Sequence, residues 1–225
     1  MRIDVFQHVA CEGPAAISDW AASHQDQLVI HKLFENDAVP PGDTLEFLVI
    51  LGGPMSVNDQ GPAWITEERR CIAEALTANV PVFGVCLGAQ QIAKTLGATV
   101  GVGKKEVGWF PIRRTATLLP FLPETLTPLH WHGETFGVPE GAVRLFESDA
   151  CANQGFVYKC QAVGLQFHME AKTDSVASLL EHDRDYIDAS PYVQTAEEIA
   201  KFPMPEENQQ TLFQLLNWLR RSNKK

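Results

Sequence analysis

Short, continuous apolar runs alternate along the first half of the chain with longer stretches in which apolar residues recur every three or four positions. The continuous runs predict β-strands at residues 2–7, 27–32, 47–51 and 80–85. The periodic stretches predict helices at 13–23, 63–78 and 88–96. Strands that alternate with helices are typical of βαβ units, so we predict an α/β fold with a mostly parallel sheet and helices on both faces.

The pattern is weaker after residue 97. It predicts strands at 99–102, 108–113, 143–146, 155–158 and 162–167, and helices at 172–185 and 211–219. The Leu- and Pro-rich segment 115–127 is predicted as helix or loop, and 186–207 as a polar segment interrupted by prolines. We expect one domain over residues 1–225, a flavodoxin-like three-layer fold with its core at about 1–185 and a helical extension at 186–225.

Cys86 lies where the pattern changes from strand to helix. Gly84 and Gly88 flank it two residues away on either side, which fits a turn too tight for neighbouring Cβ atoms. Such a nucleophile elbow lifts the side chain clear of the backbone, and the N-terminus of the following helix favours the thiolate form. The alternative is that Cys86 is a small buried hydrophobic residue, as most free cysteines are.

A base for such a nucleophile is available near the end of the strand predicted at 162–167. His168 and Glu170 are two residues apart, so on a strand their side chains point to one side and the carboxylate can orient the imidazole. The alternative is a strand end that happens to carry two polar residues.

Two further segments carry weaker signals. The Gly52–Gly53 loop follows a buried strand and can present a backbone N–H group to an oxyanion, with the N–H of Leu87 as its partner, although glycine turns are more often only turns. His130 and His132 flank Trp131 and could begin a metal site. Because no further ligands are near them in the sequence, we expect loop histidines with ordinary hydrogen bonds and no metal.

Composition narrows the class of function. The chain has 225 residues, 28 acidic and 18 basic, and a formal net charge of −10, which disfavours nucleic-acid binding. No run approaches the length of a membrane span, and the first residues do not form a signal peptide. Five widely spaced cysteines without a C-x-x-C pair fit reduced thiols, so we expect a cytoplasmic protein.

Together, the segments 84–90, 51–54 and 166–170 resemble the motifs of the class I, triad-type glutamine amidotransferases. The resemblance covers about residues 44–170, and it is greatest to the glutamine amidotransferase domain of GMP synthase and its stand-alone relatives. Three ordered motifs at the expected spacing make a specific match. The segment His132-Gly133-Glu134-Thr135 resembles the family's segment near the glutamine site more loosely.

The resemblance implies roles for named residues. Cys86 would be the nucleophile, His168 the general base and acid, and Glu170 the residue that orients the imidazole. The N–H groups of Gly53 and Leu87 would form the oxyanion hole. The glutamine substrate would be held by the following residues: Gln90 and the backbone around Asn153, Gln154, Gly155 and Phe156. This sequence has Met169 where the family usually has proline, which removes no catalytic group.

The family hydrolyses the γ-carboxamide of glutamine through a cysteinyl thioester and needs no cofactor for this step. Family members pass the ammonia to a synthetase, but only about 55 residues follow Glu170 and no phosphate-binding P-loop is present, so we expect any synthetase to be a separate protein chain. A stand-alone hydrolase of γ-glutamyl peptides is the alternative enzyme. The alternative of another class is a glutamine-binding or regulatory protein without turnover.

Overall fold

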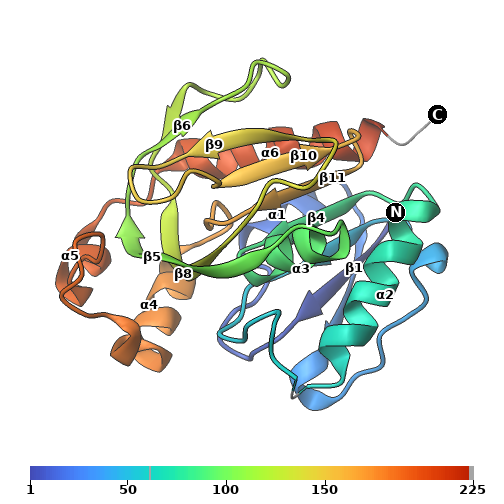
Figure 1. Cartoon of the computed structure of the whole chain (residues 1–225), viewed down its shortest axis with the longest axis horizontal. Helices are drawn as coiled ribbons and strands as arrows, with labels where there is room; N and C mark the ends of the chain where they lie inside the picture. Colours follow the sequence, from blue (N-terminus) through green and yellow to red (C-terminus); the bar gives the residue numbers. More distant parts are fainter. Residues whose placement is uncertain (61, 223–225) are drawn as a thin grey trace.

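The computed structural model describes residues 1–60 and 62–222. Within these residues, nine strands form one sheet in the order β2-β1-β3-β4-β11-β10-β9-β6-β7 (Figure 1). The first five strands in this order are all parallel to one another. They are β2 (Gln27–Lys32), β1 (Arg2–Gln7), β3 (Leu48–Ile50), β4 (Val82–Val85) and β11 (Ala162–Leu165).

Antiparallel strands extend this sheet beyond β11. They are β10 (Gly155–Tyr158), β9 (Ala142–Glu147), β6 (Ile112–Arg114) and β7 (Thr125–Leu126). A separate antiparallel pair is formed by β5 (Val100–Trp109) and β8 (Leu129–Phe136). β4 and β11 are neighbours in the parallel half, so the segments that follow them begin side by side at the same edge of the sheet.

Helices cover both faces of the main sheet (Figure 1). α2 (Trp64–Thr77) and α3 (Leu87–Thr95) cover one face, whereas α1 (Ala16–Ser23) and α6 (Glu206–Ser222) cover the other. α4 (Thr173–His182) and α5 (Ala196–Lys201) pack beside the β5–β8 pair, and short 3-10 turns lie at Leu33–Glu35, Gly42–Thr44 and Arg184–Tyr186. None of the helices among the described residues has both the length and the apolar content that a bilayer span requires.

Successive side chains along the parallel strands point to opposite faces of the sheet, so they contribute to two separate apolar clusters. In β3, Leu48 and Ile50 face the cluster under α2 and α3. Val49 faces the other cluster, to which α6 contributes four fully buried leucines at the predicted helical spacing: Leu212, Leu215, Leu216 and Leu219. Because both faces are covered, these strands read as continuous apolar runs in the sequence.

The predicted α/β class with a largely parallel sheet is confirmed, and β1 and β2 have the predicted bounds. The second half differs more from the prediction. Residues 100–109 form one strand where two short ones were predicted, and 129–136 form a strand where loop histidines were expected. Both strands carry polar residues among apolar ones, which hides their periodicity. Segment 115–127 is mostly turns and ends in β7, and the polar segment 186–207 includes α5.

Candidate active site

Cys86 forms the turn between β4 and α3 and has a positive φ, with φ 52° and ψ −107°. A residue other than glycine adopts such a backbone conformation only when its surroundings enforce it. A Cβ atom on Gly84 would lie 2.6 Å from the carbonyl group of Gly88. The two backbone segments therefore approach too closely for any residue but glycine at position 84, as predicted. The N–H of Cys86 donates to the Leu165 carbonyl at 2.8 Å, which ties the turn to β11.

His168 and Glu170 follow β11. The imidazole Nδ1 lies 2.6 Å from Glu170 Oε1, and both side chains are nearly fully buried. The N–H of His168 donates to the Leu129 carbonyl at 2.8 Å, which fixes this segment against β8. His168 also borders a cavity of about 560 Å³ between α4 and the start of α6.

Two nearby groups, Glu170 and Cys86, shift the pKa of His168. Burial lowers the pKa of His168, but the negative charge of Glu170 and hydrogen bonding to the Cys86 sulfur outweigh burial, so this pKa lies well above its ordinary value. The structure pairs His168 with Glu170, and this pair follows the strand next to the one that precedes Cys86. The roles of the three residues as a triad remain a prediction.

The Cys86 thiol opens into a cavity of about 190 Å³. Its Sγ lies 3.8 Å from the Trp131 carbonyl oxygen, and Gln166 Nε2 approaches the same sulfur at 3.7 Å. The lining residues come from several loops and from β8: Glu12, Gly53, Pro54, Met55, Ser56, Cys86, Gln90, Trp131, His132, Gly133, Glu134, Asp183 and Tyr186. A cavity smaller than the usual 300–1,000 Å³ of drug-sized ligands suits one amino acid.

Three carboxyl groups line this cavity, and sequence reasoning missed two of them, Glu12 and Asp183. Burial raises the pKa of the Glu12 carboxyl, while the nearby positive charge of His168 opposes the shift. Asp183 accepts a 2.7 Å hydrogen bond from the Trp131 indole, and Glu134 accepts one of 3.0 Å from Ser56. Glu12 lies outside the predicted elements, and Asp183 falls within the helix predicted at 172–185, which in the structure ends at His182.

Tyr186 was also missed by sequence reasoning, and it lines the same cavity as Asp183. Burial, with the negative charges of the site, raises the pKa of its phenol to about 12. The hydroxyl stays protonated at neutral pH and is available as a hydrogen-bond donor toward the cavity.

The two predicted oxyanion-hole residues have different positions relative to the cavity. Gly53 lines it, and a Cβ atom at this position would lie 3.1 Å from Leu87 Cδ2. Leu87 is the first residue of α3 and directly follows Cys86. The role of their N–H groups as hydrogen-bond donors to the oxyanion remains a prediction.

Of the predicted substrate-binding residues, Gln90 lies at the cavity, where its amide is 3.4 Å from the Glu134 carbonyl. The structure does not bring the others to the cavity. Asn153 donates to the Phe136 carbonyl at 3.0 Å, and Gly155 and Phe156 are buried in β10, where the Phe156 ring packs on Phe136. The described residues that line the cavity include none of these three. Their role in glutamine binding stays a prediction that the geometry of the cavity does not support.

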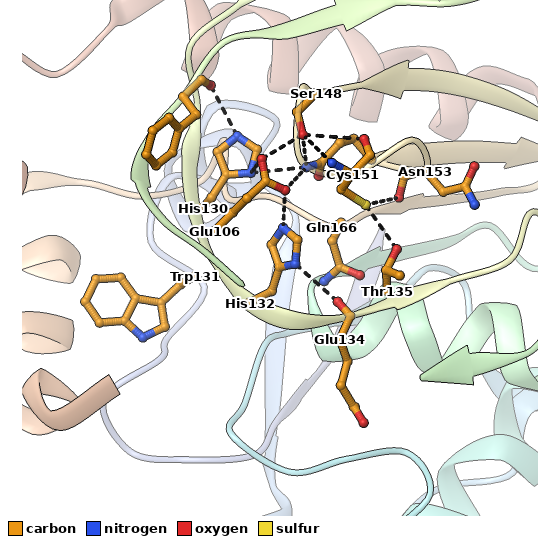
Figure 2. Close-up of polar contacts among 12 residues, drawn as sticks. Glu106, His130, Trp131, His132, Glu134, Thr135, Ser148, Cys151, Asn153 and Gln166 are labelled. Atoms are coloured by element: carbon orange, nitrogen blue, oxygen red, sulfur yellow. Dashed lines mark hydrogen bonds and ion pairs between the residues drawn. The ribbon is translucent and has the colours of Figure 1, made fainter. Parts of the chain in front are cut away.

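A cluster of polar side chains lies between β5 and β8 (Figure 2), and one of its members, His132, lines the cavity. Glu106, His130 and His132 are all buried, and one ligand atom from each lies within 4.8 Å of the others. The prediction considered only neighbours in the sequence, and it missed Glu106, which β5 pairs directly with His132. Burial lowers the pKa of His130 to about 4, so its imidazole is neutral at pH 7.

The parallel sheet, the cysteine elbow and the adjacent histidine define an α/β protein with a cysteine-centred site. The family model of glutamine amidotransferase class-I matches residues 25–183. The chain is 32% identical over 195 residues to the glutamine amidotransferase-like protein YfeJ of Salmonella typhimurium, and the match covers 82% of each chain. The chain therefore belongs to the class I glutamine amidotransferase family.

More distant relatives include one of the subunits of the glutamine-hydrolysing GMP synthase of Methanocaldococcus jannaschii. It is 30% identical over 128 residues, which cover 55% of this chain and 63% of that protein. The match to the GMP synthase of Vibrio cholerae covers only 26% of that protein.

Solved structures are similar over nearly the whole chain. A glutamine amidotransferase of Methylobacillus flagellatus has a TM-score of 0.85 at 27% identity and is matched over 99% of this chain and 92% of that one. A glutamine amidotransferase of Thermotoga maritima has a TM-score of 0.84 at 29% identity, with 100% and 99% covered. The agreement extends to the C-terminal segment that the family model does not match.

Proposed function

We propose that this protein hydrolyses the γ-carboxamide of glutamine, giving glutamate and ammonia. The observation that supports the proposal is that β4, which directly precedes Cys86, pairs with β11, which leads into the hydrogen-bonded His168–Glu170 pair. A thiolate paired with a protonated imidazole is a nucleophile and an acid in one site.

The reaction follows from these positions. The thiolate attacks the γ-carbonyl carbon, and the N–H groups of Gly53 and Leu87 stabilise the resulting oxyanion. His168 gives its proton to the departing ammonia, which leaves a γ-glutamyl thioester on Cys86. Water then attacks the thioester, His168 accepts a proton from that water, and glutamate leaves.

Glutamine is favoured over γ-glutamyl peptides by the size of the cavity, about 190 Å³. Its acidic lining suits a ligand with an α-amino group, because no Lys or Arg is among the described lining residues and Glu12, Glu134 and Asp183 are.

The ammonia would pass to a separate synthetase. Support comes from the Methanocaldococcus jannaschii relative, which is named as one subunit of a GMP synthase. We expect the isolated chain to hydrolyse glutamine slowly and to become faster when its synthetase is added.

The direct test replaces Cys86 by serine. We expect Cys86→Ser to abolish ammonia release while its circular dichroism stays that of the parent. Cys160→Ser, at an exposed cysteine, is the matched control and should keep full activity. Mass spectrometry of the quenched parent should show a γ-glutamyl adduct on Cys86. Turnover retained in Cys86→Ser would remove the nucleophile assignment.

A substrate panel and a binding measurement separate the remaining alternatives. Glutamine and γ-glutamyl dipeptides are compared by ammonia or amine release, and faster release from dipeptides would favour a peptide hydrolase. Titration calorimetry of Cys86→Ser with glutamine is read beside turnover of the parent. Binding without any turnover by the parent would identify a glutamine-binding protein.

A further inference from the structure

Glu106, His130 and His132 converge between β5 and β8 (Figure 2), and His132 also lines the Cys86 cavity. Their side chains are between 0% and 2% exposed, so bulk water does not solvate them. The proposed glutamine hydrolysis gives this cluster no role. A carboxylate and two imidazoles that are buried together need either mutual hydrogen bonds or a cation.

Backbone carbonyl groups fix the tautomer of both histidines. His130 Nε2 lies 3.2 Å from the Phe110 carbonyl oxygen, and His132 Nδ1 lies 3.2 Å from the Glu134 carbonyl oxygen. A carbonyl oxygen only accepts, so each of these two nitrogens carries a hydrogen. A ring that binds a metal ion does so through its unprotonated nitrogen, which with these partners is His130 Nδ1 and His132 Nε2.

Both of these nitrogens lie near the carboxylate of Glu106. His132 Nε2 is 3.2 Å from Glu106 Oε2, and His130 Nδ1 is 3.9 Å from Glu106 Oε1. His132 Nε2 is buried and has no hydrogen-bond partner, and the same is true of the amide oxygen of Gln154 beside it. The Gln154 amide also approaches His130 Nδ1, at 3.4 Å, so His132 Nε2 is the ring nitrogen left without a donor, and a cation placed between it and the carboxylate would satisfy it.

We propose that Glu106, His130 and His132 bind a divalent transition-metal ion of the Zn²⁺ type. Zinc–ligand bonds of about 2.0–2.1 Å at tetrahedral angles place neighbouring ligand atoms roughly 3.4 Å apart. One ligand atom from each of the three residues lies within 4.8 Å of the others, so a bound ion would draw these atoms somewhat closer together. Two imidazole nitrogens and one carboxylate suit zinc and its neighbours, whereas Mg²⁺ and Ca²⁺ prefer oxygen ligands alone.

Each proposed ligand is itself held by a hydrogen bond to a neighbouring group, as metal ligands in proteins usually are. Ser148 donates to Glu106 Oε1 at 2.6 Å, and the Gln154 amide donates to Glu106 Oε2 at 2.6 Å. The carbonyl partners of the two imidazoles orient the rings in the same way. His132 also lines the Cys86 cavity, whose acidic groups would attract a cation toward the cluster.

The ion would have a structural role. β8 carries His130 and His132 and also Trp131, whose carbonyl oxygen lies 3.8 Å from the Cys86 sulfur. A metal that joins β5 to β8 would hold this wall of the cavity in place. The inference does not depend on the proposed hydrolysis, because it concerns binding and can be measured without substrate.

The test uses the full chain, treated with a chelator and returned to metal-free buffer. We expect titration calorimetry and elemental analysis to find one Zn²⁺ per chain and a higher Tm with Zn²⁺ present. Substituted Co²⁺ should give the visible spectrum of a four-coordinate nitrogen and oxygen site. It should lack the sulfur-to-cobalt charge-transfer band that binding to a cysteine would produce.

Two variants and one control complete the experiment. Glu106→Gln and His132→Gln should each weaken Zn²⁺ binding by about tenfold or more and remove the Tm increase. His182→Gln, at an exposed histidine on α4, should bind like the parent. Circular dichroism of each variant shows whether it is folded. The proposal is overturned if the folded parent binds no Zn²⁺, if Glu106→Gln and His132→Gln bind it like the parent, or if cobalt is bound through sulfur.

Discussion

The imidazole of His8 lies 2.9 Å, through its Nδ1, from the carbonyl oxygen of Gly52. That oxygen belongs to the same peptide group as the N–H of Gly53, and in a trans peptide the two point in opposite directions. A fully buried side chain thus fixes the direction of the N–H that is proposed to bind the oxyanion. His8 is in turn oriented by Glu68, whose Oε2 lies 3.0 Å from the imidazole Nε2.

This relationship makes His8 a positioning residue with a measurable effect on kcat. Asparagine places its amide nitrogen near the Nδ1 position, whereas glutamine reaches nearer to Nε2. We expect His8→Gln to lower kcat for glutamine by roughly 10- to 100-fold, below the loss of a whole oxyanion donor, with a smaller change in KM. His8→Asn should retain more activity than His8→Gln. Equal kcat values for both folded variants and the parent would contradict this role.

The His8–Glu68 pair should also make stability depend on pH. Burial lowers the pKa of His8, but the charge of Glu68 and its hydrogen bond outweigh burial, so this pKa is raised above 6.5. A raised pKa in the folded state stabilises the fold at pH values below about 6.5, and the contribution is lost as the pH rises through the folded-state pKa.

Glu68→Gln removes the partner charge, so we expect it to lower the free energy of unfolding at pH 6 by on the order of 3 kcal/mol. The difference from the parent should shrink toward pH 9. Urea unfolding of both proteins at the two pH values measures it. A loss that is the same at pH 6 and pH 9 would show that His8 carries no extra proton in the folded state.

Glu170 is expected to hold the proton on His168. Its carboxylate, 2.6 Å from Nδ1, raises the pKa of the imidazole well above the ordinary value. In Glu170→Gln that pKa should fall, since burial then acts with less opposition, and kcat should drop by about 10²-fold or more. Titration of the His168 ring signals by NMR gives the direction of the shift directly. Glu140→Gln, at an exposed position, is the control. An unchanged His168 titration would rule out Glu170 as the source of the shift.

The cysteine elbow could be predicted from the sequence because its requirements are local. Gly84, Cys86 and Gly88 lie within five residues, and the close approach that demands the glycines is built into the turn itself. The parallel strands were predicted for a similar reason, since burial on both faces makes each one a continuous apolar run.

The Glu106–His132 contact could not be predicted in this way. It joins two strands, β5 and β8, that β6 and β7 separate in the chain. It depends on the register of β5 against β8, which shifts between Val102 and Glu106. Lysines at 104 and 105 interrupt the apolar pattern there, so one strand was predicted as two. The cavity residues Glu12 and Tyr186 lie outside the predicted strands and helices, where only the folded chain shows what they face.

Gly88 provides the sharpest test of the elbow, because the backbone of β3 lies directly against it. A Cβ atom on Gly88 would overlap with the carbonyl oxygen of Ile50, and the Gly88 N–H donates to the Leu51 carbonyl at 3.1 Å. Neither contact can yield without separating α3 from the end of β3, which carries the Gly52–Gly53 loop.

We expect Gly88→Ala to lower kcat/KM for glutamine by about 10²-fold or more and to lower the Tm by several degrees, since one misplaced backbone segment moves both Cys86 and Gly53. Gly101→Ala is the matched control, because a Cβ atom there meets nothing within 4 Å. Thermal unfolding and steady-state kinetics of both variants measure the effect. If Gly88→Ala keeps the activity and the Tm of the parent, α3 does not pack against β3 as closely as described, and the positions of the sulfur and the oxyanion donors are not fixed by this contact.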